Sequence, residues 1–233
     1  MKTLRESLLD INDVETSIDP ITMIDNWCKD NIDGQYVIDK KTLVINSSSS
    51  VKITNKKLVE FPSYIRFGTI RGSFSCNDCV LLTSLKGAPK EVREGFSCLN
   101  CTSLVSLKGC PKKVGKEFYC MGCTSLTSLE GTPKEVGTEF SCSGCTSLTS
   151  LEGAPKEVGG SFYCIYCTSL TSLKGAPEKV GKDFYCTRCF SLKSLEGAPK
   201  EVGGDFGCDD CPSLKSLEGA PTHIKGEIYS DIK

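Results

Sequence analysis

Residues 158–175 read V-G-G-S-F-Y-C-I-Y-C-T-S-L-T-S-L-K-G, and close relatives of this stretch recur along most of the chain. Its phenylalanine returns every 22 residues without an insertion, and an isoleucine takes the same place in an eighth, incomplete copy. These positions are Phe74, Phe96, Phe118, Phe140, Phe162, Phe184, Phe206 and Ile228. A fixed period between about 20 and 50 residues is typical of a solenoid, in which each unit leaves an apolar face that its neighbour covers.

Each copy contains a short strand pattern followed by apolar residues at regular spacing. Phe162 and Cys164 lie two residues apart, as in a strand with one buried face, so Tyr163 and Ile165 should point away from the core. The predicted core positions of this copy are Phe162, Cys164, Cys167, Leu170, Leu173, Pro177 and Val180. The proline argues against a regular helix in the return segment of each coil, so we expect an extended or 3₁₀ convex side there.

The spacing Phe-x-Cys-x-x-Cys-x-x-Leu-x-x-Leu of residues 162–173 resembles the leucine-rich repeat. Cys167 stands where that motif has Asn or Cys, and the run C-T-S-L-T-S resembles the BspA-like repeats of bacteria. Very similar repeats occur in uncharacterised proteins of gut bacteria and their phages. Two features differ, because Gly159 stands where the first Leu is expected and the Ala-Phe pair of BspA-like repeats is absent.

The resemblance covers about residues 51–233 and implies a fold. It implies an α/β-type solenoid that is mostly β, a right-handed coil with parallel strands on a concave face. It also implies that the second cysteine of each copy joins a ladder that bonds backbone groups at the turn out of the strand. On this basis residues 51–233 form a solenoid of about eight coils.

Residues 1–50 precede the repeats and are predicted to form a small α+β cap on the first coil; a separate docking module is the alternative. Apolar residues at helical spacing predict a helix over residues 2–11. Asp19 followed by Pro20 predicts the start of a second helix, because Asp is a favoured N-cap and Pro a favoured first residue. Residues 35–46 have the pattern of a β-hairpin.

Charge and hydropathy exclude several classes of partner. The net charge is −1, which gives no electrostatic reason to expect nucleic acid or an anionic membrane. Arg5, Glu6 and Asp10 interrupt the N-terminal apolar residues, so no secretion signal is predicted, and no stretch reaches the ~18 apolar residues of a membrane span. We therefore expect a cytoplasmic protein, in the host cytoplasm if a phage encodes it.

The 16 cysteines are concentrated in seven C-x-x-C pairs that keep the repeat period. Neighbouring pairs have the spacing C-x2-C-x18-C-x2-C, which fits four-thiolate zinc sites, so a zinc-stapled repeat protein is one alternative. The odd number of pairs and their core positions favour buried thiols instead. Residues three apart on a strand are about 10 Å apart, whereas a disulfide requires less than about 7 Å. We predict buried thiols, with no metal or cofactor; whether every thiol is free does not follow from the spacing.

Catalytic signals are weak. The single histidine, His223, lies in the last coil without a sequence context for a general base. The G-G-S-F and G-G-D-F turns lack the Lys-Ser/Thr that follows in a phosphate-binding loop. We predict no catalytic residues and no enzymatic activity.

Residues beside the buried Phe and Cys positions form columns along the predicted strand face. Their centre is aromatic and apolar and their border is acidic, which is typical of protein interfaces; the alternative is that tyrosine simply suits a strand surface. The candidate binding residues are Glu117, Tyr119, Met121, Glu139, Tyr163, Ile165, Tyr166, Asp183, Tyr185, Arg188, Asp205, Asp209 and Asp210.

The predicted function is that of a non-enzymatic scaffold that binds a protein partner with a basic patch through its concave strand face. A structural or assembly protein of a phage or of a host-takeover complex is the second hypothesis. The last strand carries Lys225, Glu227, Asp231 and Lys233, which either guard a bare edge or form a seam for self-association.

Overall fold

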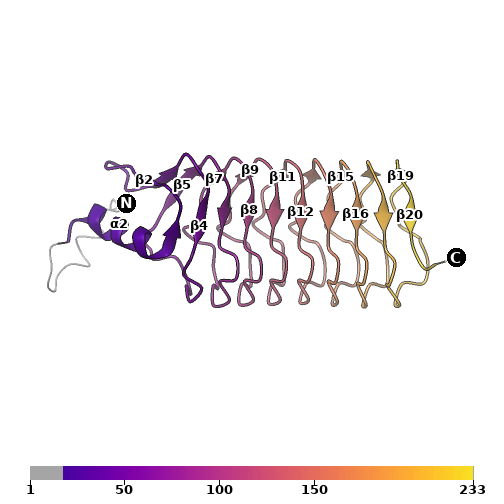
Figure 1. Ribbon diagram of the computed structural model, residues 1–233. Helices are drawn as coiled ribbons and strands as arrows, with labels where there is room; N and C mark the ends of the chain where they lie inside the picture. Colours follow the sequence, from indigo (N-terminus) through magenta and orange to yellow (C-terminus); the bar gives the residue numbers. More distant parts are fainter. Residues whose placement is uncertain (1–17, 233) are drawn as a thin grey trace, which may run out of the picture.

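The computed structural model describes residues 18–232, so the helix predicted over residues 2–11 lies outside the described residues. The protein is a mostly β solenoid of about eight coils. The coils lie side by side in a row, and in the view of Figure 1 this row has no marked bend. None of the helices in the described part of the chain is long and apolar enough to cross a membrane.

Two sheets of ten strands each run along the row. The first sheet contains the strands that begin at the repeated phenylalanine. In spatial order its strands are β1 (Ile32–Asp33), β4 (Val51–Ile53), β6 (Phe74–Ser75), β8 (Phe96–Ser97), β10 (Phe118–Tyr119), β12 (Phe140–Ser141), β14 (Phe162–Tyr163), β16 (Phe184–Tyr185), β18 (Phe206–Gly207) and β20 (Ile228–Tyr229). All pair in parallel except β1, which pairs antiparallel with β4.

The return segments form the second sheet. In chain order its strands are β2 (Val37–Ile38), β3 (Ile45–Ser47), β5 (Phe67–Ile70), β7 (Glu91–Val92), β9 (Lys113–Val114), β11 (Glu135–Val136), β13 (Glu157–Val158), β15 (Lys179–Val180), β17 (Glu201–Val202) and β19 (His223–Ile224). Of the two conformations expected for these segments, the structure has the extended one. Their regular pairing into a sheet is a feature that the sequence analysis did not predict.

Stacked phenylalanines form the centre of the core. Phe162 is fully buried and pairs in register with Phe140 and Phe184. Its ring centroid lies 5.0 Å from that of Phe140 and 5.1 Å from that of Phe184, with the rings nearly parallel. Buried leucine, valine and cysteine columns complete the core, so each coil covers the apolar face of the next, as the 22-residue period predicts.

The helix and hairpin predicted before the repeats are confirmed. Helix α2 (Pro20–Asn31) begins with Asp19 as N-cap, whose carboxylate accepts a hydrogen bond from the Thr22 amide at 3.2 Å. Strands β2 and β3 pair antiparallel around a turn at residues 40–42. Because β3 also pairs in parallel with β5, the second sheet continues across residue 50. The division into a cap and a solenoid at residue 50 stays a prediction.

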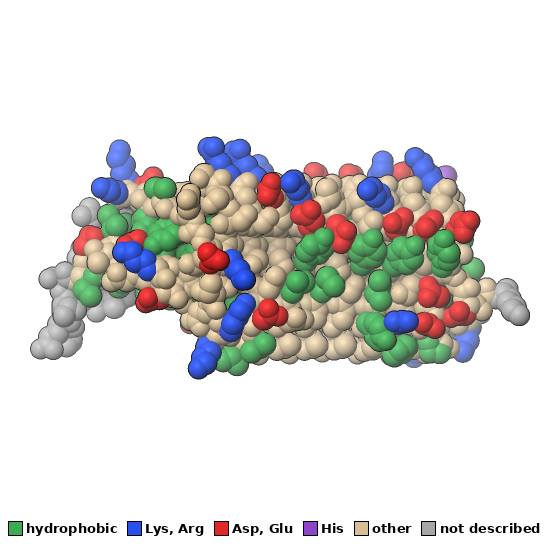
Figure 2. Space-filling view, in the orientation of Figure 1, with side chains coloured by type: hydrophobic (Ala, Val, Ile, Leu, Met, Phe, Trp, Pro, Cys, Tyr) green, Lys and Arg blue, Asp and Glu red, His purple; other side chains and the backbone are tan. Residues whose placement is uncertain are grey.

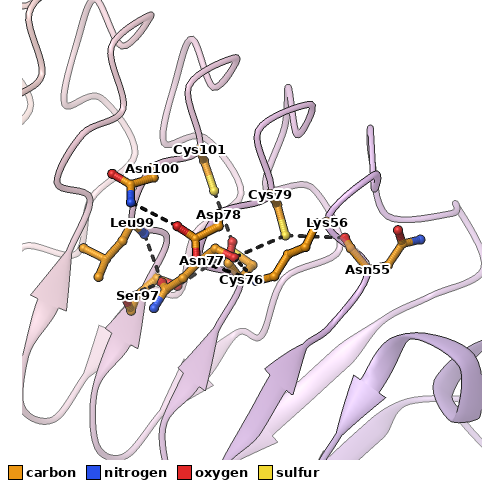
Figure 3. Close-up of polar contacts among 10 residues, drawn as sticks. All are labelled: Asn55, Lys56, Cys76, Asn77, Asp78, Cys79, Ser97, Leu99, Asn100 and Cys101. Carbon is orange, nitrogen blue, oxygen red and sulfur yellow. Dashed lines mark hydrogen bonds and ion pairs between the residues drawn. The ribbon is translucent and has the colours of Figure 1, made fainter.

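The cysteines form a ladder of thiol hydrogen bonds inside the coils. The Cys101 thiol donates to the carbonyl oxygen of Cys76 at 3.1 Å, and Cys145 repeats this contact with Cys120 at 3.1 Å. Figure 3 shows the first of these contacts and the start of the ladder at Cys79. All 16 cysteines are buried, as predicted, and free. Among residues 18–232 no group of three or more His, Cys, Asp or Glu side chains is arranged to hold a metal ion.

Candidate functional site

A row of tyrosines lies on the outer surface of the first sheet. In-register pairing places Tyr163 beside Tyr185, with ring centroids 6.0 Å apart. Tyr185 also stacks with Tyr229 at 6.5 Å. We call this row the Tyr strip, and it consists of Tyr119, Tyr163, Tyr185 and Tyr229. Figure 2 shows hydrophobic side chains gathered in a row along this part of the molecule.

Between Tyr119 and Tyr229, small residues fill the two places in this column where tyrosine is missing. Ser141 stands between Tyr119 and Tyr163 and is only 2% exposed. Gly207 stands between Tyr185 and Tyr229, and a Cβ atom there would overlap the Tyr185 ring. The Tyr185 ring therefore leans across the intervening coil, which extends the aromatic surface to Tyr229.

Carboxylates border the strip on the side where the strands begin. We call this set the acid row, and it consists of Glu117, Glu139, Asp183, Asp205 and Glu227. Asp183 accepts a hydrogen bond from the Asp205 amide at 3.0 Å, and Asp205 accepts one from the Glu227 amide at 2.9 Å. Stacked acidic side chains are thus held in place by the backbone of the next coil.

Burial and the neighbouring carboxylates change the acidity of the tyrosines. Burial raises the pKa of Tyr119 to about 12, with a further contribution from its hydrogen bond to Glu139. Burial, with the charges of Asp205 and Asp183, raises the pKa of Tyr185 to about 12 as well. The hydroxyl groups therefore stay protonated at neutral pH and can donate hydrogen bonds to a ligand or to the acid row.

Met121, Ile165 and Asp209 border the strip on the side where the strands end. Each follows the first cysteine of its pair, and Met121 is 39% exposed. Together with the strip and the acid row they form one continuous surface. The columns through these positions contain no Lys or Arg from Phe74 onward, so this surface is acidic and aromatic.

The structure places Tyr166, Arg188 and Asp210 in a second group. They lie in the turn between the two cysteines, where the backbone is left-handed with φ of 61°, 59° and 54°. The Arg188 guanidinium lies 5.3 Å from the Tyr166 ring centroid, and its Nε donates to Asp210 at 3.1 Å. Glycine and asparagine occupy this position in other coils because they tolerate positive φ, whereas Tyr and Arg are strained there.

Phe190 joins this second group and was missed in the sequence analysis. It is 46% exposed, and its ring packs edge-on against Tyr166 at 6.0 Å. We call Tyr166, Arg188, Phe190 and Asp210 the turn cluster; it lines a hollow of about 650 Å³ together with Pro212. The signal was available, because Phe190 replaces a threonine that four preceding copies share. Tyr229 was also omitted from the candidate residues, although it is 43% exposed.

A shallow groove of about 1150 Å³ lies on the second sheet and contains none of the predicted binding residues. Lys112 and Lys134 lie at its side, and Gly115, Gly137 and Gly159 line it as well. The protein thus has an aromatic surface on one sheet and this groove on the other.

The side chains on the first sheet can make non-covalent contacts with a ligand. They offer aromatic edges, hydroxyls and carboxylates, and the only histidine of the chain, His223, is exposed on the second sheet. Comparisons of the chain with protein-family models, curated proteins and solved structures give no significant match.

Proposed function

We propose that the protein is a non-enzymatic binding scaffold whose Tyr strip and acid row bind a protein partner with a basic patch. The observation that carries this proposal is the stack of Tyr163, Tyr185 and Tyr229 bordered by carboxylates. Aromatic centres with a charged rim are characteristic of protein interfaces. The absence of Lys and Arg from these columns favours a cationic partner.

The orientation of the rings indicates which class of partner fits the Tyr strip. Tyr163 and Tyr185 stack with ring centroids 6.0 Å apart and an interplanar angle of 21°, so each ring covers part of the other's face. Sugars and free cations bind best on ring faces, which are partly covered within this stack. Ring edges, hydroxyls and carboxylates suit a protein surface that contributes apolar contacts together with Lys or Arg.

The stack also favours binding through its rigidity. The rings of Tyr163, Tyr185 and Tyr229 are held by their neighbours in the free protein, and Tyr has few rotatable bonds to order. A surface that is already arranged loses little conformational entropy on association. The scaffold therefore supplies a preformed surface rather than a flexible loop.

We further propose that the solenoid is of the leucine-rich-repeat type, with its strand face concave and residues 1–50 as the cap. The thiol ladder supports this proposal, because Cys167 occupies the Asn/Cys position of the motif and donates to the Cys142 carbonyl oxygen at 3.3 Å. Helix α2 supports the cap, because Trp27 packs against Phe61 with ring centroids 6.2 Å apart.

The test is capture of the partner from the cytoplasmic fraction of the native host cell. Replacing Tyr163 and Tyr185 together by Ala should reduce capture at least tenfold, because it removes two adjoining rings from the centre of the surface. The matched control replaces two exposed residues of adjacent coils outside the Tyr strip and the groove, Glu196→Ala with Glu218→Ala, and should leave capture unchanged. Equal capture by wild type and the tyrosine double variant would refute the proposal.

A further inference from the structure

Ion pairs between coils follow one rule in this protein. Outside helix α2, every ion pair among the described residues joins the same position of two adjacent coils. Lys108 pairs with Glu130 at 3.0 Å, and Lys174 pairs with Glu152 at 3.1 Å. These columns thus place opposite charges next to each other, which avoids repulsion between side chains one strand spacing apart, about 4.8 Å.

One column of the second sheet does not follow this rule. We call it the lysine ridge, and it consists of Lys90, Lys112, Lys134 and Lys156 in four successive coils; Glu178 occupies the next position. The Lys112 amide donates to the Lys90 carbonyl oxygen at 3.0 Å, and the Lys156 amide donates to that of Lys134 at 2.8 Å, so these residues are stacked. All four are exposed, and within residues 18–232 none of them takes part in an ion pair.

The acid row of the first sheet also places like charges in adjacent coils, and its charges are negative. Glu117 and Glu139 occupy adjacent coils, as do Asp183, Asp205 and Glu227. Backbone amides compensate Asp183 and Asp205, but the structure shows no such hydrogen bond to the carboxylates of Glu117 and Glu139 in the described part of the chain. Like charges stacked in this way are unfavourable in the isolated chain, so a partner of opposite charge would relieve both columns.

A groove of about 1150 Å³ lies beside the lysine ridge. At Gly115, Gly137 and Gly159 a Cβ atom would overlap the carbonyl oxygen of the preceding coil, so this part of the groove has no side chains. Glu135 and Glu157 also line the groove, but form no ion pair with the ridge.

We propose that the Tyr strip and acid row of one copy dock on the groove and lysine ridge of a second copy of this chain. This inference rests on the proposed binding role of the strip and names the partner's chemistry. Both surfaces repeat with the same coil spacing, so neighbouring carboxylates of the acid row, such as Glu117 and Glu139, can face lysines of successive coils in the second copy. Because the contact joins two different surfaces, one copy of the pair keeps a free Tyr strip and the other keeps a free groove. Further copies can therefore add to the assembly.

Charge reversal gives a test with an internal control. The first variant combines Lys112→Glu with Lys134→Glu, and the second combines Glu117→Lys with Glu139→Lys. At low ionic strength, wild type should reach at least twice its monomer mass of 25.2 kDa as concentration rises in sedimentation equilibrium. It should return toward the monomer at ~0.5 M salt, because screening shortens the range of these charges.

Each variant alone should stay monomeric, since each presents two surfaces of the same sign. An equimolar mixture should associate again, because the reversed ridge of one variant matches the reversed row of the other. The control exchanges the charges of an internal pair, Lys108→Glu with Glu130→Lys, and should associate like wild type. The milder variant Lys112→Gln with Lys134→Gln removes the two charges without reversing them and should associate at least fivefold more weakly than wild type. It keeps the test valid if a reversal variant fails to fold.

Two results would overturn the inference. One is a wild type that remains at 25.2 kDa at every concentration in low salt; the other is association that persists in both reversal variants. If wild type is monomeric but still captures a host partner that the Tyr163 and Tyr185 changes release, self-docking fails while the scaffold function stands. If wild type associates through these columns but the tyrosine changes leave host capture intact, the capture proposal fails instead.

Discussion

The ring of Tyr185 stacks with that of Tyr229 at 6.5 Å, although a whole coil separates the two residues. Gly207 occupies the intervening position and leaves room for the Tyr185 ring to lie across it. One glycine therefore determines whether the last part of the Tyr strip is continuous.

Gly207→Ala should break this contact without unfolding the protein. The new methyl group would occupy the space of the Tyr185 ring, which has to rotate away, while the backbone at Gly207 has no positive φ to strain. We expect stability within about 1 kcal/mol of wild type and loss of the nuclear Overhauser effect between the Tyr185 and Tyr229 rings. Ser141→Ala is the control. Retention of that effect in Gly207→Ala would show that the glycine is not what permits the stacking.

The left-handed turn at Tyr166 gives a second prediction. A non-glycine residue in this conformation costs about 1–2 kcal/mol, but Asn tolerates it. Asn100 occupies the same position as Tyr166, three coils nearer the N-terminus. Tyr166→Asn should therefore retain the stability of wild type within about 0.5 kcal/mol, whereas the β-branched Tyr166→Val should lose about 1–2 kcal/mol. Urea unfolding of both variants measures the difference. Equal stability of the two would contradict the assigned backbone conformation.

Two phenylalanines one coil apart should differ sharply in their effect on stability. Phe162 is 0% exposed and stacked on both sides, so Phe162→Ala should destabilise by about 3–5 kcal/mol through lost contacts and the cavity left behind. Phe190 is 46% exposed, so Phe190→Ala should cost less than about 1 kcal/mol. Thermal unfolding of the two variants provides the comparison. A large loss in Phe190→Ala would mean that the turn cluster is part of the core.

Much of this architecture can be predicted from the sequence, and specific residues show where prediction ends. The 22-residue period and the Phe162–Cys164 spacing predicted the coil, the parallel strands and the buried faces. The second sheet was missed because its strands, such as Glu157–Val158, are too short to show an alternating pattern. The contact of Tyr185 with Tyr229 depends on a side-chain orientation that no spacing encodes.

The separation of the turn cluster from the strip could have been anticipated. Gly122 and Gly144 occupy the position of Tyr166 in other coils, and glycine at a repeated turn position signals a left-handed backbone that redirects the side chain. Tyr166 was grouped with Tyr163 and Ile165 because a continuous strand was assumed through the cysteine pair. The strand in fact ends at Tyr163, and the chain turns before Cys167.

Alkaline pH should destabilise the protein, because the fold favours the protonated forms of buried thiols and of Tyr185. Burial raises the pKa of Cys164 and Cys186 well above its ordinary value, and burial with nearby carboxylates raises that of Tyr185 to about 12. In the unfolded chain these groups titrate near about 8.5 for thiols and about 10 for tyrosine. A raised pKa in the folded state contributes stability that is complete below the unfolded value and is lost as pH rises toward the folded value.

The unfolding temperature should therefore be constant up to about pH 8 and fall progressively between about pH 8.5 and 12. The thiols should begin this decline and the tyrosines should steepen it above about pH 10, where tyrosinate absorbance reports the second group directly. Tyr185→Phe is the matched control, because it keeps the ring stack but removes the titrating hydroxyl, and its decline above pH 10 should be shallower. An unfolding temperature that does not change up to pH 11 would mean that the Cys164 and Cys186 thiols ionise as readily in the folded protein as in the unfolded chain, which is incompatible with their full burial.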